Sequence, residues 1–289
     1  MRNTLDLLVI GGGAAGFFAA ANVAEQDPSL RVAILEKTGK LLSKVRISGG
    51  GRCNVTHACF DNRLLSEFYP RGNRELLQAF SRFSPAGTIE WFSSHGVELK
   101  TEEDGRMFPV TDNSLSVVSC LTEVIHRNNV EVHLHCGVEK ISKKENFFEV
   151  TAGGSVFHSE NVLIAAGGNP SSGFYDFIRE TGHVIVPPVP SLFTFNIRSA
   201  ELASLMGISV PGASVEIKEA NIFTEGPVLI THWGLSGPAI LKASSLGAKW
   251  MADRQYNFEA AVNWLNPAEA ETVFEELKWI KMQHPRQKV

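Results

Sequence analysis

Short apolar runs alternate with amphipathic stretches through the first part of the chain. The run from Leu5 to Ile10 has the length and branched composition of a strand buried on both faces. A stretch rich in alanine and phenylalanine follows from Ala15 to about Gln26, and a second apolar run spans Arg31 to Leu35. Strand, helix and strand in this order are typical of the βαβ unit of a parallel sheet. The pattern therefore predicts an α/β fold.

Five later segments extend this pattern. We predict a helix over 74–95 that restarts at Ser84-Pro85, a helix over 114–128 and a strand over 131–135. Residues 144–156 predict a hairpin that turns at Gly153-Gly154, and 161–168 predict a buried strand that opens into small residues. The apolar side chains of the helix over 74–95 are expected in the core: Leu76, Leu77, Phe80, Phe83, Ile89, Trp91 and Phe92.

The pattern changes after Gly173. A proline-rich connector, Val186 to Pro190, precedes short alternating runs at 192–197, 214–218, 221–224 and 228–231. Such runs predict an antiparallel barrel or sandwich, followed by helical stretches. We expect two domains, a Rossmann-like domain over 1–186 and a mainly-β, barrel-like domain with helices over 187–289.

Composition narrows the class of protein. A chain of 289 residues with 44% hydrophobic and 20% charged residues is an ordinary globular protein of two domains. The net charge of −4 argues against nucleic acid as a partner, because such binding depends on neutralising phosphates. No apolar run reaches the length of a membrane span, and four cysteines are too few for a disulfide scaffold. We expect a cytoplasmic protein without a metal site.

The first candidate site is a glycine turn after the first strand. Gly11, Gly13 and Gly16 form G-x-G-x-x-G, and Glu36 ends the second strand twenty residues later. Gly11 permits the tight turn, Gly13 admits a pyrophosphate to the backbone, and Gly16 lets the helix approach the strand. The N-terminus of the helix offers N–H groups to phosphate, and Glu36 can accept hydrogen bonds from an adenosine ribose. The turn predicts a dinucleotide site.

A second glycine cluster favours FAD over NAD as that dinucleotide. A basic loop over 37–47 leads into Ser48-Gly49-Gly50-Gly51-Arg52-Cys53-Asn54. Consecutive glycines suit backbone that lies against a flat ring, and Arg52 offers positive charge to a reduced, anionic flavin. The alternative is a solvated basic loop without a ligand. An enzyme that uses NAD alone is disfavoured, because one glycine loop would suffice for it.

These motifs, together with Thr231-His232-Trp233-Gly234-Leu235-Ser236-Gly237-Pro238, resemble the YhiN-like (BaiN-like) NAD(P)/FAD-dependent oxidoreductases. The resemblance implies a glutathione-reductase-type FAD domain that is interrupted by an inserted domain of β-barrel and helical parts. It leaves the substrate open, although one branch of the family is linked to bile-acid metabolism. In FAD domains of this type, backbone near Val138 commonly touches adenine, and the strand over 161–168 has the pattern of the strand that passes close to the cofactor. The alternative for either segment is a core strand followed by a turn. The residues expected to bind FAD are Gly11, Gly13, Ala14, Ala15, Gly16, Glu36, Lys37, Lys44, Ser48, Gly49, Gly50, Gly51, Arg52, Cys53, Asn54, Val138, Ala165, Ala166, Gly167 and Gly168.

Candidates for chemistry on the substrate are fewer. His232, at a strand end before a glycine turn and a helix N-terminus, could donate a proton there, with Trp233 beside it. The alternative is a histidine that bonds the turn and a tryptophan that fills the barrel mouth. Cys53 and Cys59 could form a redox disulfide, but five residues separate them where flavin disulfide reductases have four, so a packing role for Cys53 is favoured. No second G-x-G-x-x-G follows, and NAD(P)H would therefore reduce the flavin from a transient site.

The resemblance also raises a question of completeness. FAD folds of this type return to the first sheet through a strand with a Gly-Asp or Gly-Glu pair, and no such pair follows Gly173. We expect a C-terminally shortened member of the family. Two functions are predicted: an FAD-dependent oxidoreductase that exchanges hydride with a small organic substrate, or a non-catalytic fragment that keeps the adenosine half of the site.

Overall fold

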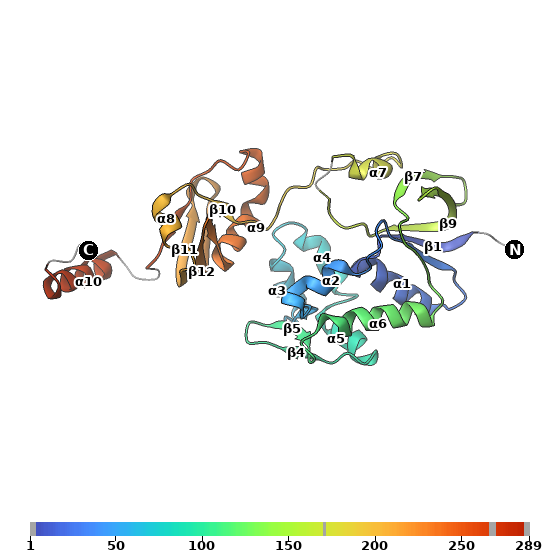
Figure 1. The fold of residues 1–289 in the computed structure, drawn as a ribbon, viewed down its shortest axis with the longest axis horizontal. Helices are drawn as coiled ribbons and strands as arrows, with labels where there is room; N and C mark the ends of the chain where they lie inside the picture. Colours follow the sequence, from blue (N-terminus) through green and yellow to red (C-terminus); the bar gives the residue numbers. More distant parts are fainter. Residues whose placement is uncertain (1–3, 170–171, 266–269, 286–289) are drawn as a thin grey trace. The chain divides into compact units, whose positions relative to one another are not determined.

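The computed structural model describes residues 4–169, 172–265 and 270–285 (Figure 1). The chain divides into two compact units, Met1–Pro187 and Pro188–Val289. This division falls one residue after the boundary expected from the proline-rich connector. The role of each unit stays a prediction.

A six-stranded sheet of order β6-β2-β1-β9-β8-β7 forms the centre of the first unit. Strands β6, β2, β1 and β9 are parallel, whereas β9, β8 and β7 are joined by antiparallel pairing. The α/β prediction is confirmed, and the hairpin turns at Gly153-Gly154 as expected. The strand bounds are Leu5–Ile10 (β1), Val32–Leu35 (β2), Glu131–His133 (β6), Val138–Lys143 (β7), Phe148–Ala152 (β8) and Ser155–Ile164 (β9).

Two helices, α1 (Ala14–Gln26) and α6 (Ser114–Arg127), bury one face against this sheet. Helix α1 uses small residues such as Ala20 and Ala21 for close approach and the fully buried Phe17 to fill the core. Truncation of a phenylalanine buried in this way costs about 3–5 kcal/mol. The rigid β1–α1 junction that results is the frame of the glycine turn.

The end of β9 is more exposed than the sequence predicts. The strand ends at Ile164, and Leu163 and Ile164 are 37% and 38% exposed. Strand β8 pairs with β9 only as far as Ser159. In the described part of the chain, the last residues of β9 therefore pair with β1 alone.

A small sheet of order β3-β5-β4 and several short helices complete the first unit. The predicted break at Ser84-Pro85 is confirmed, but the expectation of a core position fails for the residues before it. Every residue of α4 is exposed or half-buried, and Phe83 is 42% exposed, whereas Phe92 of α5 is buried. Helix α4 lies beside α3, which is too short to cover it. The bounds are Thr56–His57 (β3), Leu99–Thr101 (β4), Arg106–Pro109 (β5), Ser43–Ile47 (α2), Asn62–Glu67 (α3), Asn73–Phe80 (α4), Pro85–Ser94 (α5) and Asp176–Arg179 (α7).

The second unit is a five-stranded antiparallel sheet of order β10-β13-β12-β11-β14, with α9 against it. The antiparallel prediction is confirmed. The described strands form an open sheet with β10 and β14 at its edges, and not the expected barrel. Helix α9 covers the apolar face of this sheet. The bounds are Phe195–Asn196 (β10), Ser209–Ile217 (β11), Ile222–Thr231 (β12), Gly234–Ser236 (β13), Ala261–Asn263 (β14), Ala200–Ser204 (α8), Pro238–Asp253 (α9) and Ala270–Gln283 (α10).

Among the described residues, none of the helices has the length and apolar character that a bilayer span requires.

Candidate functional site

The glycine turn after β1 has the backbone that its sequence predicts. Gly11 has φ +118°, and a Cβ built on it would lie 2.4 Å from the carbonyl oxygen of Ala165. A Cβ on Gly16 would lie 2.0 Å from the carbonyl oxygen of Gly11. Neither position can hold a side chain unless the backbone moves. The turn is therefore fixed by contacts between β1, α1 and the end of β9.

Gly13 differs from these two glycines. It holds the N-cap position of α1, and no described atom outside its chain neighbours lies within 4 Å of a Cβ built on it. Space is therefore open beside the helix N-terminus, where N–H groups and the helix dipole favour an anion. This cradle fits a dinucleotide pyrophosphate, with Ala14 and Ala15 opening the helix behind it.

Glu36 is held in place at the end of β2. Its Oε2 accepts a hydrogen bond of 2.8 Å from Gly12 N, and its Oε1 accepts bonds of 2.8 Å from the N and Oγ1 of Thr38. A carboxylate has about four acceptor positions, so one remains for a ligand hydroxyl. The predicted ribose contact is compatible with this arrangement.

A cavity of about 710 Å³, the Glu36 cavity, lies at the carboxyl ends of β1 and β2. It brings together Gly11, Glu36, Lys37, Val138 and Ala166, which the sequence places far apart. Its wall also includes Asp176 and Glu180 around α7, which sequence reasoning did not identify. No motif marks these two carboxylates, because α7 approaches the cavity only through the fold.

The basic segment before the second glycine cluster, expected as a loop over 37–47, ends in a short helix. Residues 43–47 form α2, and the chain then passes through Gly49, Gly50 and Gly51, with φ of +55°, +70° and +86°. Cys53 also has positive φ, +63°, and is buried. We call residues 48–54 the glycine loop. Burial raises the pKa of the Cys53 thiol, so the thiol is protonated and packs as an apolar group.

A second cavity of about 460 Å³, the Cys53 cavity, has Ala14 and Ala15 of the α1 N-terminus in its wall. Side chains of apolar residues such as Phe18, Phe92 and Leu121 form most of its wall. Such a lining suits a flat aromatic ring. The predicted residues in its wall are Ala14, Ala15, Lys44, Ser48, Cys53 and Asn54.

Lys44 also reaches the end of β9. A Cβ built on Gly167 would lie 3.7 Å from Lys44 Nζ. The ammonium thus lies near the segment after β9 as well as in the wall of the Cys53 cavity. Lys44 shares this wall with Ala14 and Ala15 at the N-terminus of α1.

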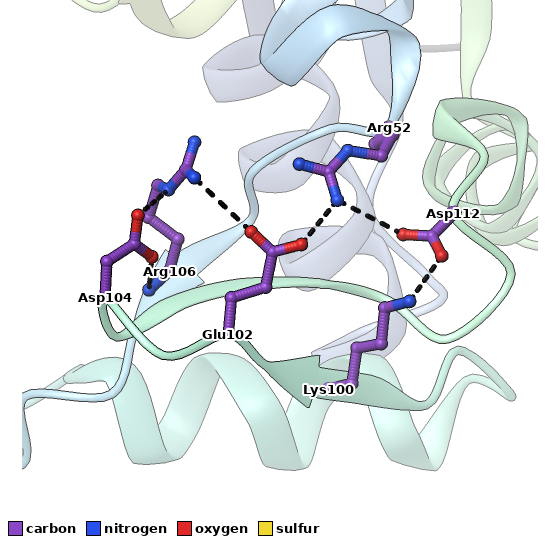
Figure 2. Close-up of polar contacts among 6 residues, drawn as sticks. All are labelled: Arg52, Lys100, Glu102, Asp104, Arg106 and Asp112. Carbon is purple, nitrogen blue, oxygen red and sulfur yellow. Dashed lines mark hydrogen bonds and ion pairs between the residues drawn. The ribbon is translucent and has the colours of Figure 1, made fainter.

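Arg52, which was expected to offer its charge to a flavin, is paired with carboxylates in the structure. Its Nη1 donates to Glu102 Oε1 at 2.5 Å and to Asp112 Oδ1 at 3.5 Å (Figure 2). The hydrogen bond to Glu102 is the main cause that raises the pKa of Arg52. Two carboxylates therefore balance the charge that was expected to face an anionic flavin. Contact of Arg52 with the cofactor stays a prediction.

His232 and Trp233 form the turn of the β12–β13 hairpin in the second unit. Both side chains are exposed, and their rings meet edge to face with centroids 4.1 Å apart. The helix N-terminus expected beside His232 belongs to α9, which begins at Pro238, after β13. A three-residue strand spans about 10 Å, so the predicted juxtaposition is wrong. The catalytic role of either residue stays a prediction.

All four cysteines are in the described part of the chain and are free thiols. Cys53, Cys120 and Cys136 are buried, whereas Cys59 is half-buried with Sγ 3.7 Å from the carbonyl oxygen of Asp61. Among the described residues, no group of three or more His, Cys, Asp or Glu side chains could hold a metal ion.

The family described as the HI0933-like protein Rossmann domain matches residues 5–252. Among curated proteins, a 3-dehydro-bile acid delta(4,6)-reductase of Clostridium scindens is 28% identical over 273 residues, which are 92% of this chain and 66% of that protein. A ribosomal RNA dihydrouridine synthase of Escherichia coli is 28% identical over 249 residues, which are 83% of this chain and 60% of that protein. The chain thus spans about two thirds of the length of these relatives.

Solved structures are more distant. The open conformation of a flavocytochrome c3 fumarate reductase is 15% identical with a TM-score of 0.49, over 73% of this chain and 47% of that one. Glycine oxidase from Geobacillus kaustophilus is 15% identical with a TM-score of 0.41, over 74% of this chain and 62% of that one.

Proposed function

The chain belongs to the HI0933-like protein Rossmann domain family, and from this membership we propose that it is an FAD-dependent oxidoreductase. The observation that carries the proposal is that the glycine turn and the start of α1 line two cavities, with Gly11 in the wall of one and Ala14 and Ala15 in the wall of the other. The Glu36 cavity has the carboxylate and backbone for an adenosine, and the Cys53 cavity has the apolar wall for a flat ring. Gly13 leaves space at the N-terminus of α1 for the pyrophosphate.

In this proposal each group of residues holds one part of FAD. Backbone N–H groups of Gly13, Ala14 and Ala15, with Lys44, bind the phosphates. Glu36 accepts from the ribose, and backbone at Val138 meets the adenine. The glycine loop, which includes Asn54, borders the flavin ring, and the segment 165–168 passes beside the cofactor. When bound, FAD supplies an acceptor or donor of hydride for the substrate.

The reductant and the substrate-side residues are further parts of the proposal. In this proposal, NAD(P)H reduces the flavin from a transient site. His232 holds a proton for the substrate, and Trp233 forms a flat surface beside it. Exposure of both side chains supports access to a substrate.

The proposed substrate is a small organic molecule with a reducible bond. One relative is named for reduction of a 3-dehydro-bile acid and another for making dihydrouridine in ribosomal RNA. The net charge of −4 favours the small molecule for this chain, because RNA affinity depends on cationic surface.

The test begins with uptake of FAD by the purified chain. A chain that binds FAD more tightly than ADP, and whose flavin bleaches on anaerobic mixing with NADH or NADPH, supports the proposal. Equal affinity for FAD and ADP would instead support a fragment that retains only the adenosine half of the site. A colourless chain that takes up neither nucleotide would contradict both functions.

A further inference from the structure

Arg52 leaves the glycine loop in a direction that avoids both cavities. Its side chain is 35% exposed and extends to the β5–β4 hairpin, where it meets Glu102 (Figure 2). The wall of the Cys53 cavity includes Cys53 and Asn54, the two residues that follow Arg52. The loop therefore presents its next residues to the cavity while Arg52 attaches it to the small sheet.

Phe108 of β5 lies against both the side chain of Arg52 and the backbone of the glycine loop. Its ring is fully buried, and the guanidinium carbon of Arg52 lies 4.0 Å from the ring centroid. A Cβ built on Gly49 would lie 2.8 Å from Phe108 Cε1. The same ring thus contacts the start of the glycine loop and the side chain near its end.

The charges around Arg52 are balanced. The six residues drawn in Figure 2 are three cations and three carboxylates. Asp112 pairs with both Lys100 and Arg52, and Glu102 pairs with both Arg106 and Arg52. Little of the charge of Arg52 remains for a ligand, so its effect on the site must come from geometry.

The glycine loop needs such an attachment. Gly49, Gly50, Gly51 and Cys53 all have positive φ, and this conformation is unfavourable for a non-glycine residue such as Cys53. Conformations of this kind persist when the surrounding structure determines them. The hydrogen bond from Cys53 N to Ser48 O, 3.0 Å long, closes the loop, and the bond from Val55 N to Met107 O, 2.9 Å long, holds the chain directly after it on β5. Arg52 adds a side-chain attachment within the loop itself.

We propose that Arg52 is a positioning residue, which fixes the glycine loop on Phe108, Glu102 and Asp112 and so sets the shape of the wall that faces the flavin ring. The effect of Arg52 on the wall that faces the flavin ring rests on the proposed function. Attachment of the loop concerns the chain without cofactor.

The experiment compares Arg52→Gln and Arg52→Lys with a matched control, Arg106→Gln. Arg106 belongs to the same network but lies 5.4 Å from the Phe108 centroid and pairs mainly with Asp104. Hydrogen–deuterium exchange of residues 48–54 is measured on the cofactor-free chain, and FAD affinity and the visible circular dichroism of bound flavin on the loaded chain. Thermal unfolding of each variant confirms that it folds.

We expect Arg52→Gln to raise exchange in the glycine loop about tenfold, the loss typical of a charge-assisted bond such as that to Glu102. FAD binding should weaken by up to the same factor, because the loaded chain must restore the order of the loop. Arg52→Lys keeps the charge but lacks the planar fork, so its effects fall between Gln and the native chain. Arg106→Gln stays close to the native chain in both measurements. Altered circular dichroism of the flavin in Arg52→Lys, at saturating FAD, would indicate a displaced wall.

Two results would overturn the proposal. Native exchange in the glycine loop of Arg52→Gln would show that the loop does not depend on Arg52. Full recovery of FAD affinity and native dichroism in Arg52→Lys would show that charge alone is needed. If Arg52→Gln does not fold, Glu102→Gln replaces it and carries the same expectations. If the native chain takes up no FAD, the proposed function fails, but the exchange measurement still decides the positioning role.

Discussion

The amide of Gly12 donates a hydrogen bond of 2.8 Å to Oε2 of Glu36 and thereby joins the glycine turn to the end of β2. The same carboxylate accepts two bonds from Thr38. Glu36 is therefore both a support of the turn and the proposed acceptor for the ribose.

Replacement of Glu36 should affect stability and binding together. In Glu36→Ala, the N–H groups of Gly12 and Thr38 lose their acceptor, which we expect to lower the free energy of unfolding by about 1–3 kcal/mol. FAD affinity should fall as well. Glu36→Gln keeps one acceptor oxygen, so both losses should be smaller. Urea unfolding and FAD titration measure them, and native FAD affinity in Glu36→Ala would remove the ribose role.

Replacement by alanine should affect the stability of the chain very differently at two glycines of the turn. Gly16→Ala places a methyl group 2.0 Å from a carbonyl oxygen, and we expect a loss of stability of about 3 kcal/mol or more. Gly13→Ala places it in open space at ordinary φ, so stability should change by less than about 1 kcal/mol.

Gly13→Ala should nevertheless weaken FAD binding, because the methyl group occupies the space proposed for the pyrophosphate. Thermal unfolding and FAD titration of the two variants are the measurement. A Gly13→Ala chain that binds FAD as the native chain does would place the phosphates elsewhere.

Burial raises the pKa of the Cys120 thiol to about 11. The folded state thus favours the protonated thiol, and this contribution to stability is present below the ordinary thiol pKa near 9.0 and lost as the pH rises through 11. Unfolding free energies between pH 8 and pH 11 should therefore fall more steeply for the native chain than for Cys120→Ala. Parallel curves for the two chains would contradict a buried, protonated Cys120.

The thiols should also differ in reactivity. Cys59 is half-buried, whereas burial raises the thiol pKa of Cys53, Cys120 and Cys136. Because the thiolate is the reactive form, Ellman's reagent at neutral pH should modify Cys59 first and the other three only on unfolding. Cys59→Ser should remove the fast phase. A fast phase that persists in this variant would identify a second accessible thiol.

His232 can be tested separately from the cofactor site. Its side chain is exposed in a hairpin turn, so His232→Ala should fold and retain native flavin content. Loss of a general acid lowers turnover about 10²–10⁴-fold. Turnover with a substrate that the native chain reduces is the measurement, and His126→Ala, which changes an exposed histidine of α6, is the control. Unchanged turnover in His232→Ala would exclude His232 from the mechanism.

The resemblance to YhiN-like (BaiN-like) oxidoreductases is confirmed at the level of the family. The motifs on which the resemblance rests are short, contiguous segments of the chain. The elements that were predicted well are also contiguous segments. Strand β1, the glycine turn and α1 follow one another along the chain, and each depends on the spacing of its own apolar and glycine residues.

The sequence by itself determined the βαβ unit, the glycine turn and the second glycine cluster, because short-range backbone preferences and hydrophobic periodicity decide them. The tertiary structure alone decided which side chains meet. Arg52 pairs with carboxylates fifty and sixty residues away, Lys44 lies near Gly167, and β13 separates His232 from α9. Such contacts depend on how sheets and helices pack across the chain, and no local pattern of residues contains that information.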